Sequence, residues 1–135
     1  MIRIVLDTNV IVSALVFGGV PRGILELAGA GQCQLFYSEP IQTEVRRVLS
    51  EKFEWPQAML QEALAVLWSM GKLVVPRTTV DAVPHDPDDN RILEYAVEAQ
   101  AQVVVFGDHH LLALQKYKSI PIVTPREFIE LFLAP

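Results

Sequence analysis

The sequence has little cysteine: Cys33 is the only one in 135 residues. An internal disulfide is therefore excluded, and a lone thiol fits a reducing compartment. No such staple is needed, because a domain of this size buries roughly 65–70% of the surface that its unfolded chain exposes. We expect a single domain over residues 1–135.

Basic residues are also few, with 11 Lys and Arg against 16 Asp and Glu and a net charge of −5. This balance argues against binding nucleic acid through a broad basic surface, because phosphates are neutralised by Lys and Arg. The argument weakens if several of the acids hold divalent cations, which would offset most of the negative charge. The distribution of charge then matters more than its sum.

Long apolar runs are missing as well. The longest nearly uncharged apolar stretch, Val10–Val20, contains Ser13 and two glycines, and it is shorter than the roughly 20 residues that span a bilayer. No basic segment followed by an apolar core opens the chain, so we expect no signal peptide. The expectation is a cytoplasmic protein without membrane association.

Hydrophobic residues are nevertheless abundant, at 51% of the chain with a mean hydropathy of +0.31. Either a sheet is covered on both faces, or an apolar surface is reserved for a partner. The candidate strands carry nearly continuous Val, Ile and Leu, which is typical of strands buried on both faces. They are Ile2–Leu6, Gln34–Tyr37, Leu73–Val75, Val103–Phe106 and Pro121–Val123.

Helical patterns lie between these strands. We expect helices from near Pro21 to Ala30, after a Ser38 cap, over Pro56–Met70, from Asp86 onward, briefly after Asp108, and after a Thr124 cap. The last begins with "TPRE", a capping box with proline at the first helical position. The alternation of strands and helices predicts an α/β fold, with a parallel sheet between helical layers and right-handed crossovers.

Two acids follow strands of this predicted sheet: Asp7 ends the first strand and Asp108 comes just after the fourth. Ligands of open α/β sheets bind beyond the carboxyl ends of the strands, so these residues are candidate partners. The alternative is that each caps a helix. For Asp7 this alternative is weaker, because Thr8 or Asn9 could cap instead.

Glu44 and Asp89 border predicted core-facing helix stripes. Glu44 lies three residues after Ile41 and four before Val48, and a carboxylate there costs several kcal/mol unless it is paired or bound to metal. Asp89 precedes Ile92 and Leu93 by three and four positions. The alternatives are a partly exposed boundary glutamate and an aspartate that only complements the helix dipole.

Four carboxylates at one edge of a sheet would repel one another, and hard divalent cations are the usual resolution. A set of oxygen ligands without cysteine suits Mg²⁺ or Mn²⁺ better than Zn²⁺. Such a site can clamp a phosphodiester and lower the pKa of water for in-line attack.

The chain resembles the PIN-domain nucleases over essentially its whole length, most closely the toxins of prokaryotic toxin–antitoxin pairs. The likeness is carried, in order, by "IVLDTNVIVSAL", "SEPIQTEVRRVL", "DPDDNRILEYA", "VVVFGDHHLLAL" and "IPIVTPREFI". It implies a three-layer α/β/α sandwich with a five-stranded parallel sheet in the order 3-2-1-4-5. It also implies an endoribonuclease that uses Mg²⁺ or Mn²⁺, a homodimer, and a cognate antitoxin.

The resemblance assigns residues as well. The acidic quartet is Asp7, Glu44, Asp89 and Asp108, and Asn9 and Asn90 match positions that support the site by hydrogen bonds. Candidate phosphate contacts are Arg22, Arg46, Arg47 and Arg91.

Two residues depart from the family pattern. Phe106 replaces a usual threonine, which removes a hydroxyl from the site, and His110 replaces a frequent acid, which puts the metal affinity in doubt. Neither change removes the four predicted ligands. The main alternative is a PIN-like module that binds RNA or protein with little catalysis. A phosphotransfer enzyme with Asp7 as nucleophile is a further alternative, disfavoured by Asn9 and by the lack of a lysine near Val123.

Overall fold

A computed structural model describes residues 1–76, 87–107 and 116–133. Within these ranges the side chains of residues 87–91 and 133 are not described. The predicted short helix after Asp108 lies outside the described residues, as does Asp86.

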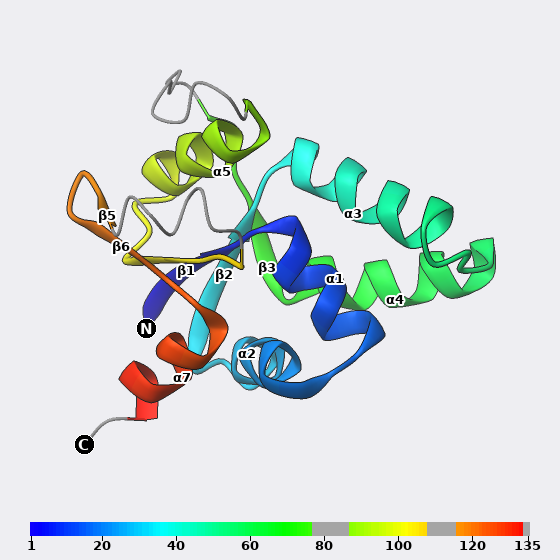
Figure 1. Cartoon of the computed structure of the whole chain (residues 1–135), viewed down its shortest axis with the longest axis horizontal. Helices are drawn as coiled ribbons and strands as arrows, with labels where there is room; N and C mark the ends of the chain where they lie inside the picture. Colours follow the sequence, from blue (N-terminus) through cyan, green and yellow to red (C-terminus); the bar gives the residue numbers. More distant parts are fainter. Residues whose placement is uncertain (77–86, 108–115, 134–135) are drawn as a thin grey trace.

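One sheet of six strands, in the order β3-β2-β1-β4-β6-β5, forms the centre of the molecule (Figure 1). Its neighbours are parallel except β5, which is antiparallel to β6. The strands are β1 (Ile2–Leu6), β2 (Cys33–Tyr37), β3 (Gly71–Leu73), β4 (Val103–Val105), β5 (Lys116–Tyr117) and β6 (Ile120–Val123). The parallel part has the predicted order, and β6 takes the place of the predicted fifth strand.

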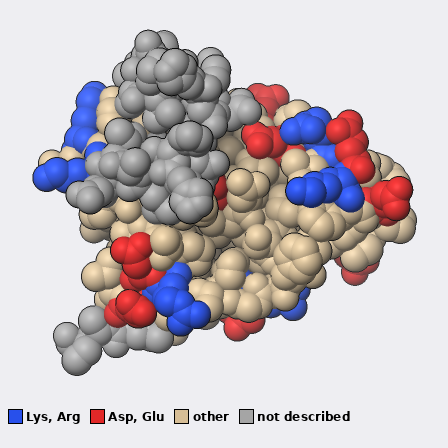
Figure 2. Space-filling model, viewed as in Figure 1, with Lys and Arg blue, Asp and Glu red and all other residues tan. Residues whose placement is uncertain are grey.

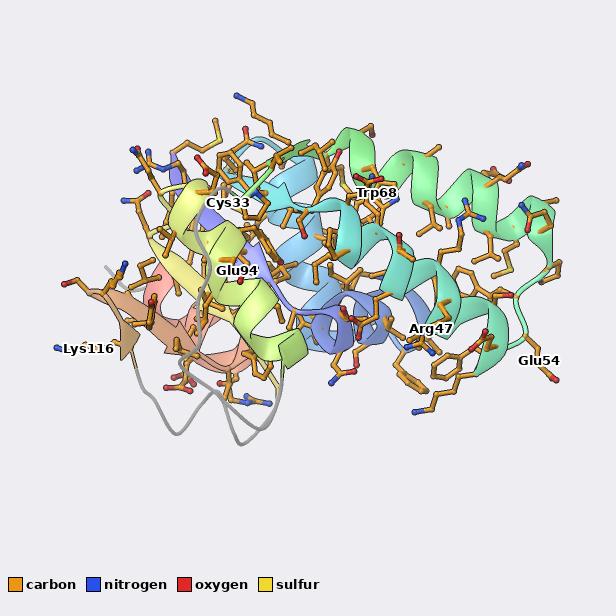
Figure 3. The ribbon with its side chains drawn as sticks, turned by 90° about the horizontal axis from the view of Figure 1, so that it is seen from above. Cys33, Arg47, Glu54, Trp68, Glu94 and Lys116 are labelled. Carbon is orange, nitrogen blue, oxygen red and sulfur yellow. The ribbon has the colours of Figure 1, made fainter. Side chains whose placement is uncertain are left out.

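Helices cover both faces of this sheet (Figure 1). Helix α5 lies on one face, whereas α1, α2 and α7 lie on the other. Helices α3 and α4 extend beyond the sheet as a hairpin, with Glu54 in the turn that joins them (Figure 3). The described helices are α1 (Thr8–Val16), α2 (Gly19–Gly29), α3 (Glu39–Glu51), α4 (Gln57–Ser69), α5 (Pro87–Glu98) and α7 (Pro125–Leu133).

Three elements differ from the sequence prediction. Helix α1 was not predicted, because its β-branched residues are poor helix formers; burial of Val10, Ile11 and Val12 overrides that propensity. Strand β5 was also not predicted, so the sheet is mixed rather than purely parallel. Strand β3 begins at Gly71, two residues before the predicted start.

Gly71 explains the position of β3. A Cβ atom at this residue would lie 2.9 Å from the carbonyl oxygen of Leu35 and 2.9 Å from a ring carbon of Tyr37. Only glycine allows the edge strand to approach β2 this closely. The predicted strand residues Leu73 and Val75 are instead 53% and 74% exposed.

The predicted capping box of the last helix is confirmed. The backbone N–H of Glu127 donates to Thr124 Oγ1, and the backbone N–H of Thr124 donates to Glu127 Oε1, both at 3.1 Å. The prediction for α3 holds only in part. Ser38 occupies the position before the helix, but its side chain makes no capping hydrogen bond.

Cys33 lies at the start of β2, where only 2% of the residue is exposed. Burial raises the pKa of its thiol from 9.0 to about 11, because the thiolate would lose its hydration. The folded protein is therefore expected to react with a thiol reagent such as DTNB only slowly at pH 8, and at the rate of a free thiol in 6 M guanidinium. Immediate labelling of the native protein would contradict this burial.

The same raised pKa makes stability depend on pH. The folded state retains the thiol proton to a higher pH than the unfolded state does, so this stabilisation is present below the unfolded pKa. It is lost as the pH rises through the folded pKa of about 11.

None of the described helices alone has the length and apolar character to cross a membrane; α1 and α2 reach both only when taken together, across a 97° bend.

Candidate active site

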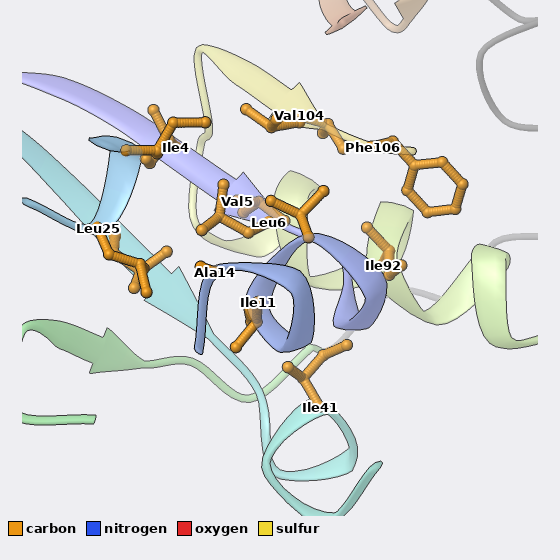
Figure 4. Close-up of a cluster of buried hydrophobic side chains, with 14 of the residues drawn as sticks. Ile4, Val5, Leu6, Ile11, Ala14, Leu25, Ile41, Ile92, Val104 and Phe106 are labelled. Carbon is orange, nitrogen blue, oxygen red and sulfur yellow. The ribbon is translucent and has the colours of Figure 1, made fainter. Parts of the chain in front are cut away.

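The N-terminal ends of α1, α3 and α5 gather at one edge of the sheet, beyond the carboxyl ends of β1 and β2 (Figure 1). Buried apolar side chains hold the N-terminal ends of these three helices together. Ile11 of α1, Ile41 of α3, Ile92 of α5 and Phe106 after β4 belong to one hydrophobic cluster (Figure 4). The positive ends of three helix dipoles therefore point toward the same region, which favours negative charge there.

Asp7 directly follows β1 and is buried, with 2% of its surface exposed. Its Oδ1 accepts a hydrogen bond of 2.7 Å from the backbone N–H of Val10, so Asp7 itself caps α1. The alternative that Asp7 caps a helix, which the sequence analysis considered the weaker one, is thus correct. This bond orients the Asp7 carboxylate. The backbone N–H of Asp7 also donates to the carbonyl oxygen of Val105 at 3.1 Å, which holds the backbone of Asp7 against β4.

Glu44 lies in α3, half-buried, in a concavity lined also by Glu39, Pro40, Thr43 and Arg47. Its position at the border of the buried face agrees with the sequence analysis, since Ile41 and Val45 on either side are buried. Helix α3 packs against α1, which begins with Asp7.

Tyr95 is a buried polar side chain that α5 contributes to this edge of the sheet. It is fully buried on α5, and its hydroxyl donates a hydrogen bond of 2.7 Å to the carbonyl oxygen of Leu6, the residue before Asp7. Burial raises the pKa of this phenol well above its ordinary value, and the negative charges of Asp7 and Glu44 raise it further. The Tyr95 hydroxyl therefore stays protonated and keeps its hydrogen bond to the Leu6 carbonyl oxygen.

Two buried hydroxyl groups at this edge have no hydrogen-bond partner among the described residues: Thr8 Oγ1 and Ser38 Oγ. Thr8 is 5% exposed and Ser38 is 1% exposed. Thr8 follows Asp7 at the end of β1, and Ser38 follows β2. Since nearly all buried polar groups are satisfied, two unpaired hydroxyls that follow neighbouring strands at the same edge need an explanation.

The other predicted site residues are placed only in part. Asp89 and Asn90 lie in the first turn of α5, but their side chains are outside the described part, and so is all of Asp108. Across the described residues no group of three His, Cys, Asp or Glu is arranged to hold a metal. Of the predicted quartet, Asp7 and Glu44 are the members with described side chains.

The candidate phosphate contacts fall at different places. Arg22 donates to the carbonyl oxygens of Ala14 (3.2 Å) and Leu15 (3.4 Å) at the end of α1. Arg47 lies on α3 beside Glu44, and it forms an exposed ion pair with Glu51 at 3.4 Å (Figure 3). The side chain of Arg91 is not described.

Acidic and basic side chains are interspersed over α3, at the right of the face drawn in Figure 2. This face carries no continuous basic band over its described residues. Binding of a polyanion here would therefore depend on a few placed cations rather than on a broad positive field.

Sequence reasoning missed Tyr95, Ser38 and the buried Glu94 on α5. Tyr95 follows Ile92 by three residues, so its burial was predictable from spacing, but its partner at Leu6 is 89 residues away. Ser38 was interpreted only as a cap. Glu94, between Leu93 and Tyr95, carried the same signal as Glu44, a carboxylate within the apolar pattern of a helix.

Comparisons with known proteins show the family of this chain. Residues 3–110 match the PIN domain family. The chain is also 32% identical over 144 residues to an uncharacterized protein of Methanocaldococcus jannaschii, covering 97% of this chain and 92% of that protein. PIN domains are generally nucleases, and they typically use divalent metals. This chain belongs to the PIN domain family.

Proposed function

We propose that this protein is a divalent-metal-dependent ribonuclease that hydrolyses phosphodiester bonds of RNA. One observation supports this most: Asp7, 37 residues before Glu44 in sequence, is buried at the start of α1, and Glu44 lies half-buried on α3, which packs against α1. Two carboxylates at the carboxyl edge of a parallel sheet, among helix N-termini, form half of the quartet that the family uses.

The residues present fit Mg²⁺ or Mn²⁺. Their donors are carboxylate and hydroxyl oxygens, which hard cations prefer, and Cys33, the only thiol, lies at the opposite end of β2. The orphaned hydroxyls of Thr8 and Ser38 also fit a hydrated ion. A divalent cation held here would supply charge neutralisation at the scissile phosphate and lower the pKa of a water molecule.

The chain's own residues then have distinct roles. Asp7 and Asp108 are proposed to hold the principal cation, with Glu44 and Asp89 completing the site. The helix cap keeps the Asp7 carboxylate in one orientation through its bond to Val10. We propose that Asn9 and Asn90 orient the acids through hydrogen bonds.

Arginines are proposed to bind the RNA backbone. Arg47 is best placed, because it lines the same concavity as Glu44, and its exposed pair with Glu51 stabilises little and can exchange for a phosphate. Arg46 and Arg91 are proposed as further contacts. Arg22 is a weaker candidate, since its guanidinium is engaged with the end of α1.

The resemblance to toxins extends the proposal to a cytoplasmic toxin that forms a homodimer and is neutralised by a small antitoxin protein. The alternative remains a PIN-like module that binds RNA or protein with little catalysis. It is favoured by one observation, the buried Phe106 at the site edge, where the family usually places a hydroxyl.

Cleavage of labelled RNA separates these functions. Wild-type protein is expected to cut in Mg²⁺ or Mn²⁺ and to stop in EDTA, with 5′-phosphate and 3′-hydroxyl ends on the products. Glu44→Gln is expected to lose about 10-fold to 100-fold in rate. Glu62→Gln, an exposed position on α4, is the matched control and should cleave like wild type. RNA that is bound but never cut would favour the binding module.

A further inference from the structure

We infer that the Ser38 hydroxyl is a further binding group of the carboxylate site, where it accepts a hydrogen bond from a water of the hydrated divalent cation. This inference rests on the proposed function. It assigns a role to a residue that the sequence analysis treated only as a helix cap.

The first observation is that Ser38 is buried without a partner. The residue is 1% exposed, and its Oγ makes no hydrogen bond to any described group. A hydroxyl withdrawn from water and left unpaired destabilises the fold. Such groups are rare in native proteins, and an ordered water or ion is their usual missing partner.

The second observation is that the Ser38 hydroxyl does not cap α3, although Ser38 occupies the capping position. Ser38 has the extended backbone of a helix cap, with φ −121° and ψ 166°, and its carbonyl oxygen accepts from the N–H of Gln42 at 3.1 Å. A capping serine would also accept a backbone N–H with its side chain. Ser38 does not, so its hydroxyl contributes nothing to α3.

The third observation is the register of the sheet. Strands β1 and β2 pair in parallel from Ile2 opposite Cys33 to Val5 opposite Phe36. Continued by two residues, the same register sets Asp7 opposite Ser38. Both residues have extended backbones, so their side chains project from the same face of the sheet.

Together these observations place an unpaired hydroxyl beside a buried carboxylate. The second orphan, Thr8 Oγ1, belongs to the residue next to Asp7. One partnerless hydroxyl thus belongs to the residue next to Asp7 and the other to the residue opposite it in register, which is expected if the partner comes from outside the chain. Mg²⁺ keeps several of its waters in protein sites, and these waters need acceptors.

Ser38→Ala tests the inference in the metal-free and the metal-bound protein. Without metal, removal of an unpaired hydroxyl is expected to leave Tm unchanged or to raise it by about 3 °C. Calorimetric titration with Mg²⁺ is expected to show roughly 10-fold weaker binding. Ser50→Ala, at an exposed serine of the same helix, should change neither value.

A lower Tm for metal-free Ser38→Ala would show a structural role and overturn the inference, and so would unchanged Mg²⁺ affinity. Failure of the proposed function gives a different result. In that case wild type itself would bind no Mg²⁺, whereas failure of the inference alone leaves Mg²⁺ binding and RNA cleavage intact in both proteins.

Discussion

Asp7→Asn is expected to lower metal-dependent RNA cleavage by at least about 100-fold while leaving the fold intact. The substitution removes the negative charge that a cation needs. It keeps an oxygen at the position of Oδ1, which accepts the N–H of Val10 at 2.7 Å in the native protein. Asparagine caps helices about as well as aspartate, so α1 should begin at the same residue.

Asp7→Ala provides the matched comparison, because it removes both the charge and the cap. We expect the same loss of cleavage and an additional loss of about 1 kcal/mol in the free energy of unfolding. Initial rates on labelled RNA and urea unfolding followed by circular dichroism measure the two effects. Wild-type cleavage by Asp7→Asn would show that the carboxylate serves only as a cap.

Tyr95→Ala is expected to lower the free energy of unfolding by about 3–5 kcal/mol. The ring is fully buried between α5 and the sheet, so the substitution leaves a cavity in the core. It also removes the hydrogen bond of 2.7 Å to the Leu6 carbonyl oxygen. That bond ties α5, which carries Asp89, to the end of the strand that carries Asp7.

Tyr95→Phe separates the hydroxyl from the ring. It keeps the packing and leaves the Leu6 carbonyl without this partner, so a loss of about 1–3 kcal/mol is expected. Tyr117→Phe, at a half-buried tyrosine of β5, is the control. Urea unfolding that shows Tyr95→Phe to be as stable as wild type would mean that the Leu6 bond contributes nothing.

The parallel part of the sheet was predictable from sequence because its strands are nearly continuous in β-branched and aliphatic residues. Ile2–Leu6 matches β1 residue for residue. Strand β5 has only two residues and depends on its pairing with β6, so no periodicity can reveal it. Helix α1 was hidden by residues that favour strands in isolation.

Some residues of the candidate site were predictable from sequence and others were not. Asp7 and Glu44 were predictable because each departs from an apolar pattern at a position that faces the core. Tyr95 and Ser38 were not, because their roles depend on contacts between distant segments. The Tyr95 hydroxyl donates to a carbonyl oxygen 89 residues away in sequence. The proposed role of Ser38 depends on the register between β1 and β2.

The acidity of the chain also has a local explanation. A net charge of −5 argues against a polyanionic substrate only if the acids are spread over the binding surface. Asp7 is buried, and Glu44 is half-buried in the same region. A cation bound between them would change the sign of the local field where the phosphate must approach.

Anomalous diffraction from crystals grown with Mn²⁺ is the most direct measurement. One strong peak is expected within coordination distance of the carboxylates of both Asp7 and Glu44, and it should vanish in Asp7→Asn. A peak that contacts neither carboxylate, in a protein that still cleaves RNA, would contradict the account.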